Sequence, residues 1–184
     1  MRVIAGEYRG RKLAAPKGDS VRPTADRVKE ALFSMLSGFT RGAKVLDVFA
    51  GTGSLGIEAL SRGADFCLFI ENSAFAAETL KANLDELRIG REAQLERMDF
   101  RTAMARHAGF GADIVFIDPP YRSGLYAETM QSLVRYDMIK RNGIAALESA
   151  GAGEADAAYD GFIMRKKKRY GKTFVTVYER MEQD

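Results

Sequence analysis

The stretch ADIVFIDPPYRSG, residues 112–124, carries the residue types in this chain that are best suited to chemistry. Because a residue before proline is held extended and proline donates no backbone hydrogen bond, the apolar strand must end here. The Asp118 carboxylate and the Pro119 carbonyl, followed by Pro120, are then two acceptors for the two N–H bonds of a planar amine. Tyr121 is a flat surface for the ring of that amine. The motif predicts a site for an exocyclic amino group, although by itself it could simply terminate a strand.

A glycine-rich turn follows another apolar run, in KVLDVFAGTGSLGIEAL, residues 44–60. Glycines make a turn tight and let a ligand approach the backbone, and the first amides of the next helix can donate hydrogen bonds to that ligand. Gly51, Gly53 and Gly56 match G-x-G-x-x-G, and Glu71 stands where the dinucleotide fingerprint has its ribose-binding acid. The turn predicts a nucleotide-type cofactor, and its literal match favours NAD.

Three kinds of protein are compatible with these two motifs: a methyltransferase, an NAD-linked oxidoreductase and a non-catalytic RNA-binding module. The oxidoreductase is disfavoured because hydride transfer needs no paired amine acceptor, and because the acid Asp47 interrupts the first strand. The non-catalytic module is disfavoured because Asp47, Glu71 and Asp118 are all intact. The residues alone leave all three hypotheses open.

The elements that must position these motifs alternate between strands and helices. Apolar, β-branched strands in alternation with helices indicate an α/β fold, with a mostly parallel sheet covered by helices on both faces. In such a sheet the ligand crevice lies at the carboxyl ends of the strands, so we expect Asp118 to face the same opening as the glycine turn. The expected strands are 44–49, 66–71, 93–98, 113–117 and 143–148, and the expected helices are 54–62, 73–87, 100–107 and 125–136.

The two ends of the chain depart from this alternation. Residues 2–14 have the glycine spacing of a short β-hairpin, and Thr24 can cap the helix that follows it. Near the C-terminus, GFIMRKKKRYG and KTFVTVYER follow one another without a helix between them. So short a connection predicts an antiparallel pair at one edge of the sheet.

Composition is typical of a single globular domain. The chain has 184 residues, of which 46% are hydrophobic, so it can bury a sizeable core. No apolar run reaches the length of a membrane span and the N-terminus lacks the apolar core of a signal peptide, so we expect no membrane partner and a cytoplasmic protein. With one cysteine, Cys67, and one histidine, His107, we expect neither a disulfide nor a metal.

Charge is distributed unevenly along the chain. Residues 1–44 hold ten Lys or Arg against four Asp or Glu, residues 45–164 hold eleven against eighteen, and residues 165–184 hold seven against three. Basic ends on an acidic middle suggest that the ends attract a polyanion. The alternative is a solvated surface, and for the run RKKKRYGK, residues 165–172, a charged edge strand that resists aggregation.

Taken together, these motifs resemble a known family. VLDVFAGTGSLGIEAL followed by DPPY is similar to the S-adenosylmethionine-dependent methyltransferases that modify exocyclic amines of bases. RVIAGEYRGRKL, RPTADRVKEALFSML and YGKT extend the likeness over nearly the whole chain, which resembles the bacterial 16S ribosomal RNA guanine-N2 methyltransferases. The resemblance implies a Rossmann-like class I methyltransferase fold, with S-adenosylmethionine as cofactor and no metal. It also implies 16S ribosomal RNA in an assembling small subunit as partner, and a monomer.

The resemblance also assigns roles to individual residues. It implies an N-terminal basic hairpin, residues 1–17, that contacts RNA, and a methyltransferase domain, residues 18–184. The catalytic set would be Asp118, Pro119, Pro120 and Tyr121. The cofactor set would be Asp47 at the methionine end, the turn residues Ala50, Gly51 and Gly53, Glu71 and Asn72 at the ribose, and Asp99 and Phe100 at the adenine. The RNA set would be Arg2, Arg9, Arg11, Lys12, Arg22, Arg27, Lys166, Lys167, Lys168 and Arg169.

Several of these assignments have a structural alternative. Asp99 could merely cap a helix, and Glu71 could be an ordinary acid at the end of a strand. Arg22 and Arg27 could close over the active site with Thr24, or Thr24 could be a helix cap. The target base also stays open, because D-P-P-Y accommodates the amine of adenine as well as that of guanine. A DNA adenine-N6 methyltransferase is therefore an alternative function.

Overall fold

The computed structural model describes residues 1–15, 23–120, 124–150 and 158–182, apart from the side chains of residues 23–25. The sequence-based assignments to Arg22, to Tyr121 and to the side chain of Thr24 therefore lie outside the described part. The domain boundary proposed at residue 17 and most of the loop 149–158 also lie outside the described part. None of the described helices is long and apolar enough to cross a membrane.

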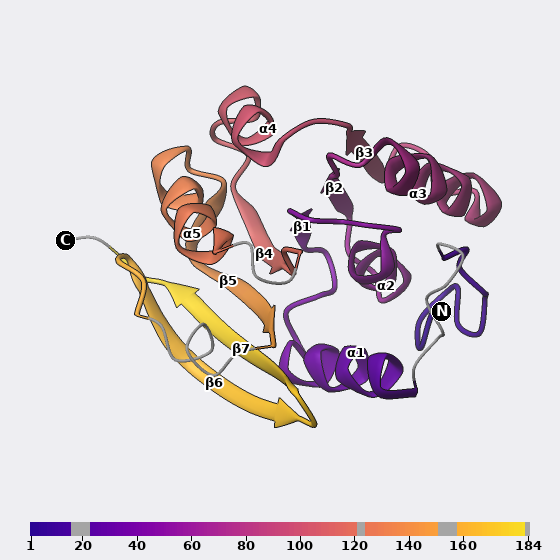
Figure 1. The fold of residues 1–184 in the computed structure, drawn as a ribbon, viewed down its shortest axis with the longest axis horizontal. Helices are drawn as coiled ribbons and strands as arrows, with labels where there is room; N and C mark the ends of the chain where they lie inside the picture. The colour runs from indigo at the N-terminus through magenta and orange to yellow at the C-terminus, as the bar shows by residue number, and fades with distance from the viewer. Residues whose placement is uncertain (16–22, 121–123, 151–157, 183–184) are drawn as a thin grey trace.

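One seven-stranded sheet organises the chain, in the order β3-β2-β1-β4-β5-β7-β6 (Figure 1). The strands from β3 to β5 are parallel neighbours, and β7 and β6 are antiparallel additions beyond β5. The strands are β1 (Lys44–Asp47), β2 (Phe66–Ile70), β3 (Ala93–Glu96), β4 (Ala112–Ile117), β5 (Ile139–Ser149), β6 (Phe162–Tyr170) and β7 (Thr173–Arg180). The helices are α1 (Pro23–Met35), α2 (Ser54–Ser61), α3 (Ala74–Leu87), α4 (Phe100–Arg106) and α5 (Leu125–Arg135). The predicted α/β class, its mostly parallel sheet and its antiparallel edge pair are confirmed.

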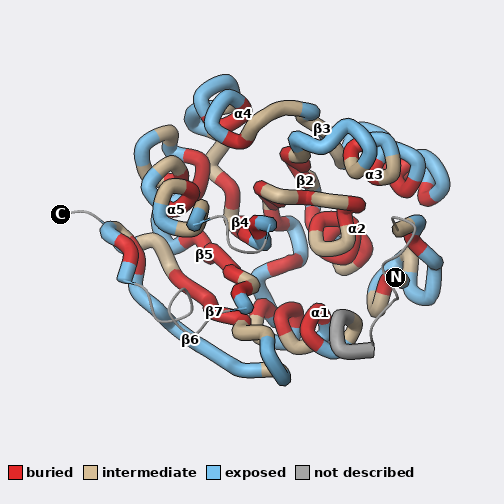
Figure 2. The backbone as a smooth tube through the Cα atoms, viewed as in Figure 1, coloured by how far each residue is buried: buried red, intermediate tan, exposed pale blue. Residues whose placement is uncertain are grey.

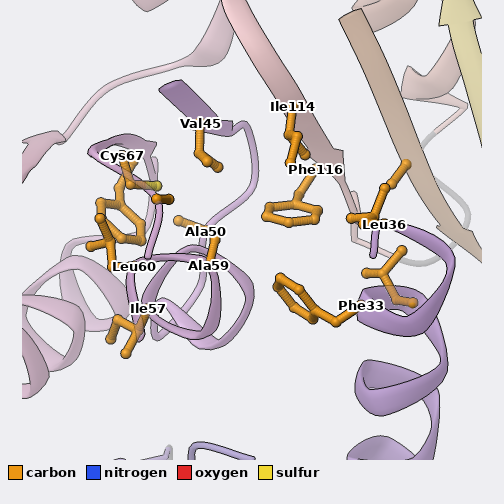
Figure 3. Packing of buried hydrophobic residues seen from close by; sticks show 14 of the residues in the cluster. Phe33, Leu36, Val45, Ala50, Ile57, Ala59, Leu60, Cys67, Ile114 and Phe116 are labelled. Carbon is orange, nitrogen blue, oxygen red and sulfur yellow. The ribbon is translucent and has the colours of Figure 1, made fainter. Parts of the chain in front are cut away.

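Helices cover both faces of the sheet, so the central strands are buried on both sides (Figure 2). On one face, α1, α2 and α3 pack against alternate residues of the strands, and the ring of Phe33 on α1 lies 5.6 Å from that of Phe116 on β4 (Figure 3). On the other face, α4 and α5 pack against the intervening residues, among them Leu46 and Val115. Because both faces are covered, the central strands β2 and β4 are almost entirely apolar and buried, as the sequence indicated, whereas the outer strand β3 is only partly buried.

Two element boundaries differ from the sequence-based prediction. The first helix begins at Pro23, so Thr24 lies within its first turn and is not its cap. Proline suits that first position because its missing N–H would have no partner inside the helix. The fifth strand begins at Ile139 and not at residue 143, because Ile139 already pairs with Ala112. The polar residues 140–142 then interrupt the pairing, with Asn142 in a left-handed conformation, before Ile144 pairs with Ile114.

A short hairpin precedes α1 and is fixed to the body of the protein. It has a single antiparallel bridge, between Arg2 and Lys12, and its residues Val3 and Leu13 are buried in the core. Its backbone amides at residues 4 and 5 donate to the buried carboxylate of Glu58 at 2.8 and 3.0 Å. The hairpin therefore packs on α2, the helix that follows the glycine turn.

Glu58 also binds two cations, one from α1 and one from the residue that caps the C-terminus of α2. Its oxygens lie 3.4 Å from Lys29 Nζ and 2.7 Å from Arg62 Nε, and both Glu58 and Lys29 are buried. Lys29 in turn donates to the backbone oxygen of Arg2 at 2.7 Å. One carboxylate thus links the hairpin, α1 and α2.

We predict that Glu58→Ala lowers the free energy of unfolding by about 3 to 5 kcal/mol, because it leaves Lys29 buried without its counter-ion. Chemical denaturation measures the change. The matched control is Glu86→Ala, which breaks an exposed ion pair with Arg11 and should cost less than about 1 kcal/mol. Equal losses in the two variants would contradict the role given to Glu58.

Candidate active site

A cavity of about 390 Å³ opens at the carboxyl ends of the parallel strands. Its wall includes residues from the turn after β1 and from the segments that follow β2, β3 and β4, which the sequence placed far apart. Of the predicted site residues, the cavity is lined by Gly51, Glu71, Asn72, Asp99, Phe100, Asp118, Pro119 and Pro120. The expectation that the D-P-P stretch faces the same opening as the glycine turn is therefore met by these residues.

Glu71 holds the glycine turn in place. One of its oxygens accepts a hydrogen bond from Gly51 N at 2.7 Å, and the other accepts one from Ser73 N at 2.6 Å. Gly51 itself has φ of +54°, and a Cβ added to it would meet no atom within 4 Å, so the cavity lies directly against its backbone. Glu71 thus links the ends of β1 and β2 and still presents carboxylate oxygens to the cavity.

Gly53 and Ala50 shape the turn from behind the cavity. Gly53 has φ of +86° and precedes the first residue of α2, where a Cβ would come within 2.2 Å of Leu80 Cδ1 on α3. The missing side chain at this position therefore lets α2 and α3 pack closely. Ala50 is buried, and its carbonyl accepts from Gly53 N at 2.7 Å. Neither residue lines the cavity.

Asp47 is a buried acid beneath the turn. Its Oδ2 accepts from Gly56 N at 3.0 Å, and it is not among the cavity-lining residues. Burial raises the pKa of Asp47 to about 7, and the nearby charge of Glu71 acts in the same direction. In the structure Asp47 supports the start of α2, so its place beside the methionine end of a cofactor stays a prediction.

Asp99 and Phe100 form the wall of the cavity after β3. Asp99 caps α4, since its Oδ1 accepts a hydrogen bond from Arg101 N at 2.9 Å. The same residue lines the cavity, and the two roles are compatible. Phe100 is buried, with its ring 5.3 Å from that of Phe49, which gives this wall an apolar surface.

Asp118 lies beside a second acid that the sequence did not single out. The last paired residues of β4 and β5 are Ile117 and Leu147, so Asp118 and Glu148 come next on neighbouring strands. Asp118 lines the cavity and is exposed there. The surrounding protein atoms nevertheless reduce its solvation, and this effect, followed by the negative charge of Glu148 and Asp47, raises the pKa of Asp118 well above its usual value. Burial also raises the pKa of Glu148. These carboxyls titrate together and hold a proton more readily than free acids.

Glu148 could have been found from the sequence by one signal. It is the acid that ends the apolar run GIAALES, much as Asp118 ends its own strand. Periodicity cannot show, however, which strand lies next to β4. The cavity also has apolar residues that carried no sequence signal, namely Val48, Phe49, Ile70, Met98 and Leu125.

The described residues predicted to bind RNA lie on the hairpin, on α1, where Arg27 is exposed, and on β6. On the hairpin, Arg2 pairs with Asp26 at 3.1 Å and Arg11 with Glu86 at 3.0 Å, and both arginines remain exposed. The basic run of β6 is exposed along the edge of the sheet. Among the described residues no cluster of His, Cys, Asp and Glu is suited to a metal.

Comparison with known proteins places the chain in a family. The family model described as "Conserved hypothetical protein 95" matches residues 1–179. The chain belongs to this family. It is 38% identical to the Bacillus subtilis protein named "Putative rRNA methyltransferase YlbH", with 98% of this chain and 99% of that protein covered. It is 34% identical to the Escherichia coli protein named "Ribosomal RNA small subunit methyltransferase D", with 100% and 91% covered.

A solved structure shares the fold described above. The structure described as "Putative methyltransferase yhhF from Escherichia coli" superposes with a TM-score of 0.89 at 35% identity, covering 100% of this chain and 99% of that one. The predicted Rossmann-like class I methyltransferase fold and the resemblance to a bacterial 16S ribosomal RNA methyltransferase family are therefore confirmed.

Proposed function

We propose that this protein transfers a methyl group from S-adenosylmethionine to the exocyclic N2 amine of a guanine in 16S ribosomal RNA of the small ribosomal subunit. The observation that carries the proposal is the meeting of two groups on one cavity wall. Asp118 and Pro119, suited to an amine, lie with Gly51 and Glu71, suited to a nucleoside. The relatives' names, "Putative rRNA methyltransferase YlbH" and "Ribosomal RNA small subunit methyltransferase D", support methyl transfer to ribosomal RNA.

The residues of the cavity fit the cofactor. Its volume of about 390 Å³ lies in the range of small-molecule sites, and both polar and apolar residues line it. Glu71 would accept hydrogen bonds from the ribose hydroxyls, with Asn72 beside it. Asp99 would accept from the adenine amine, and Phe100 and Met98 would cover the ring. When bound, S-adenosylmethionine would supply a methyl group that its sulfonium charge has already activated, and it would leave as the neutral thioether S-adenosylhomocysteine.

Asp118 and Pro119 orient the amine that receives the methyl group. The lone pair of the guanine N2 is delocalised into the ring, so the free amine is a poor nucleophile. Hydrogen bonds from its two N–H groups to the Asp118 carboxylate and the Pro119 carbonyl turn the lone pair out of conjugation, and positioning of this kind contributes several kcal/mol to catalysis. After transfer the nitrogen carries an extra proton, which Asp118 or water accepts.

The amine must leave its base stack to reach Asp118. A base in a single strand or a hairpin loop costs least to extrude, so such a target is expected. Tyr121 would stack on the exposed base. The hairpin of residues 1–17 and the basic run of β6 would contact RNA phosphates, which position a substrate without reading its sequence. We further propose a cytoplasmic monomer that acts on an assembling subunit.

Other functions make different predictions for one experiment. A DNA adenine-N6 methyltransferase would use the same two acceptors, an oxidoreductase would bind NAD, and a binding module would transfer nothing. The protein is incubated with labelled S-adenosylmethionine and small-subunit particles, naked 16S RNA or DNA, and the nucleosides are then identified. We expect N2-methylguanosine from the ribosomal substrates. Methyladenine in DNA, or calorimetry that shows tighter binding of NAD than of S-adenosylmethionine, would overturn the proposal.

Asp118→Ala should lower kcat by on the order of 10²- to 10³-fold, because the amine loses one of its two acceptors. Affinity for S-adenosylmethionine, measured by calorimetry, should stay within a few-fold of wild type. Asp118→Asn is the matched variant, since it keeps a carbonyl acceptor of similar size and should lose less. Wild-type turnover in the alanine variant would remove the core of the mechanism.

Glu71→Ala should weaken S-adenosylmethionine binding by about 1 to 3 kcal/mol, because a charged acceptor is lost from the cavity. The same change frees the amides of Gly51 and Ser73, so Glu71→Gln serves as the control that keeps a side chain of the same length. Calorimetry on both variants, with unfolding measured in parallel, separates the two effects. If Glu71→Ala binds with wild-type affinity, the ribose is held elsewhere.

The pH dependence of turnover should report the pair formed by Asp118 and Glu148. Glu148 raises the pKa of Asp118, and the amine needs Asp118 ionised, so activity falls as pH drops through that pKa. Glu148→Gln removes the added charge and lowers the pKa of Asp118, so the acidic limb of the kcat profile should move to lower pH. Glu148→Asp keeps the charge and should leave the limb in place. A lower kcat with an unmoved limb in Glu148→Gln would mean that Glu148 is only structural.

A further inference from the structure

The basic run of β6 lies on an edge strand with two distinct sides. Among the described strands β6 pairs only with β7, and every residue from Ile163 to Arg169 is exposed, as the pale blue tube in Figure 2 shows. From Lys166 to Tyr170 the pairing with β7 is regular. Because successive side chains of a strand point to opposite faces, a run of consecutive basic residues must divide between the two sides of the sheet.

The register shows which residue lies on which side. Lys166 pairs with Val177 and Lys168 with Val175, and both valines belong to the core cluster beneath α1. Lys166 also lines a groove with Met35 of α1. Lys166 and Lys168 therefore lie on the α1 side.

The other two basic residues lie on the opposite side. Lys167 pairs with Thr176 and Arg169 with Phe174, the residues that alternate with the valines. Lys167 Nζ and the Arg169 guanidinium each lie 5.5 Å from the centroid of the Phe174 ring. Arg169 Nε also donates to the carbonyl of Gly171 at 2.8 Å. These two side chains thus cover an aromatic residue of their own hairpin.

Lys166 and Lys168 have no such engagement within the described part of the chain. Neither has an ion pair, hydrogen bond or aromatic contact with a described residue. Their ammonium groups carry charge into solvent on the side where the acids of the cavity also lie.

The acids and these lysines share one side of the sheet. Phe116 and Ala146 lie on the α1 side of the sheet, and Asp47 pairs with Phe116. Asp118 and Glu148 come two residues after Phe116 and Ala146 on their strands, so the alternation of side chains places them on the same side. Glu148 pairs with Val175, which pairs with Lys168, so Lys168 lies in the same row two strands away. At a strand spacing of about 4.8 Å, the row from Asp118 on β4 to Lys168 on β6 spans about 14 Å.

This arrangement suits a polyanion whose base enters an acidic cavity. Phosphates are repelled by the carboxyls around Asp118, so they must be held at some distance from it. Lys168 and Lys166 provide positive charge at that distance, on the side of the sheet to which Asp118 and Glu148 belong. Lys167 and Arg169 lie on the other side.

We propose that the RNA strand flanking the target base runs along the α1 side of β6, where Lys166 and Lys168 bind its phosphates, whereas Lys167 and Arg169 do not contact it. The inference rests on the proposed function. It divides the basic run, which is continuous in the sequence, into two residues that bind RNA and two that do not.

Two double variants with the same loss of charge test the inference. Lys166→Gln with Lys168→Gln changes the α1 side, and Lys167→Gln with Arg169→Gln changes the opposite side. Binding of a 16S RNA fragment is measured over a salt series, with S-adenosylmethionine affinity and unfolding as controls for the fold. The first variant should bind about 25-fold more weakly at 0.1 M salt, and its plot of log K against log salt should be shallower by about 1.4, at about 0.7 for each phosphate contact on a single strand. The second should keep the wild-type affinity and slope.

Equal losses in the two variants, a larger loss in the second, or no loss in either would overturn the inference. Failure of the proposed function gives a different result. In that case the wild-type protein itself shows no salt-dependent RNA binding and methylates no ribosomal substrate. A wild type that binds and methylates RNA, together with two equivalent variants, rejects the path along β6 alone.

Discussion

The parallel alignment of β2, β1, β4 and β5 is the constraint on which the site depends. The carboxyl ends of parallel strands lie side by side, so the residues that follow these strands meet there although they are distant in sequence. Glu71, Asp47, Asp118 and Glu148 all owe their proximity to this alignment. Helices cover both faces of the central parallel strands, so the ends of these strands are where a ligand can reach them. The cavity lies there for that reason.

Gathering acids at one edge has an electrostatic consequence. Desolvation raises the pKa of Asp47 and of Asp118; the charge of Glu71 adds to the first effect, and the charges of Glu148 and Asp47 add to the second, so both groups hold protons more readily than free aspartates. Backbone amides offset part of this cost, since Asp47 accepts from Gly56 N and Glu71 accepts from Gly51 N. The same hydrogen bonds fix the glycine turn. The hydrogen bonds that stabilise these acids therefore also shape the proposed cofactor site.

The antiparallel pair β7 and β6 extends the sheet beyond the site. It adds a positively charged strand to a sheet whose cavity is acidic. β7 is buried between β5 and β6, whereas β6 is exposed at the edge and carries the basic run. An edge strand with lysines is protected from pairing with other chains, and this property does not depend on RNA. Glu148 nevertheless pairs with Val175, and Val175 pairs with Lys168, so the acids of the cavity and this basic strand lie at the same level of the sheet. The opposite signs of charge on one side of the sheet are the basis for the RNA path proposed above.

The sequence by itself determined the alternation of strands and helices, the antiparallel final pair and the two motifs, because local periodicity and proline or glycine chemistry act over a few residues. It was wrong on Thr24 as a cap and on the start of β5, since Ile139 is a strand residue only by pairing with Ala112. It gave Gly51 and Gly53 one role, whereas Gly51 borders the cavity and Gly53 packs against Leu80. Only the tertiary structure decided that Glu148 lies beside Asp118 and that the basic run divides between two sides. Strand order and register arise from contacts between distant segments, and no local pattern records them.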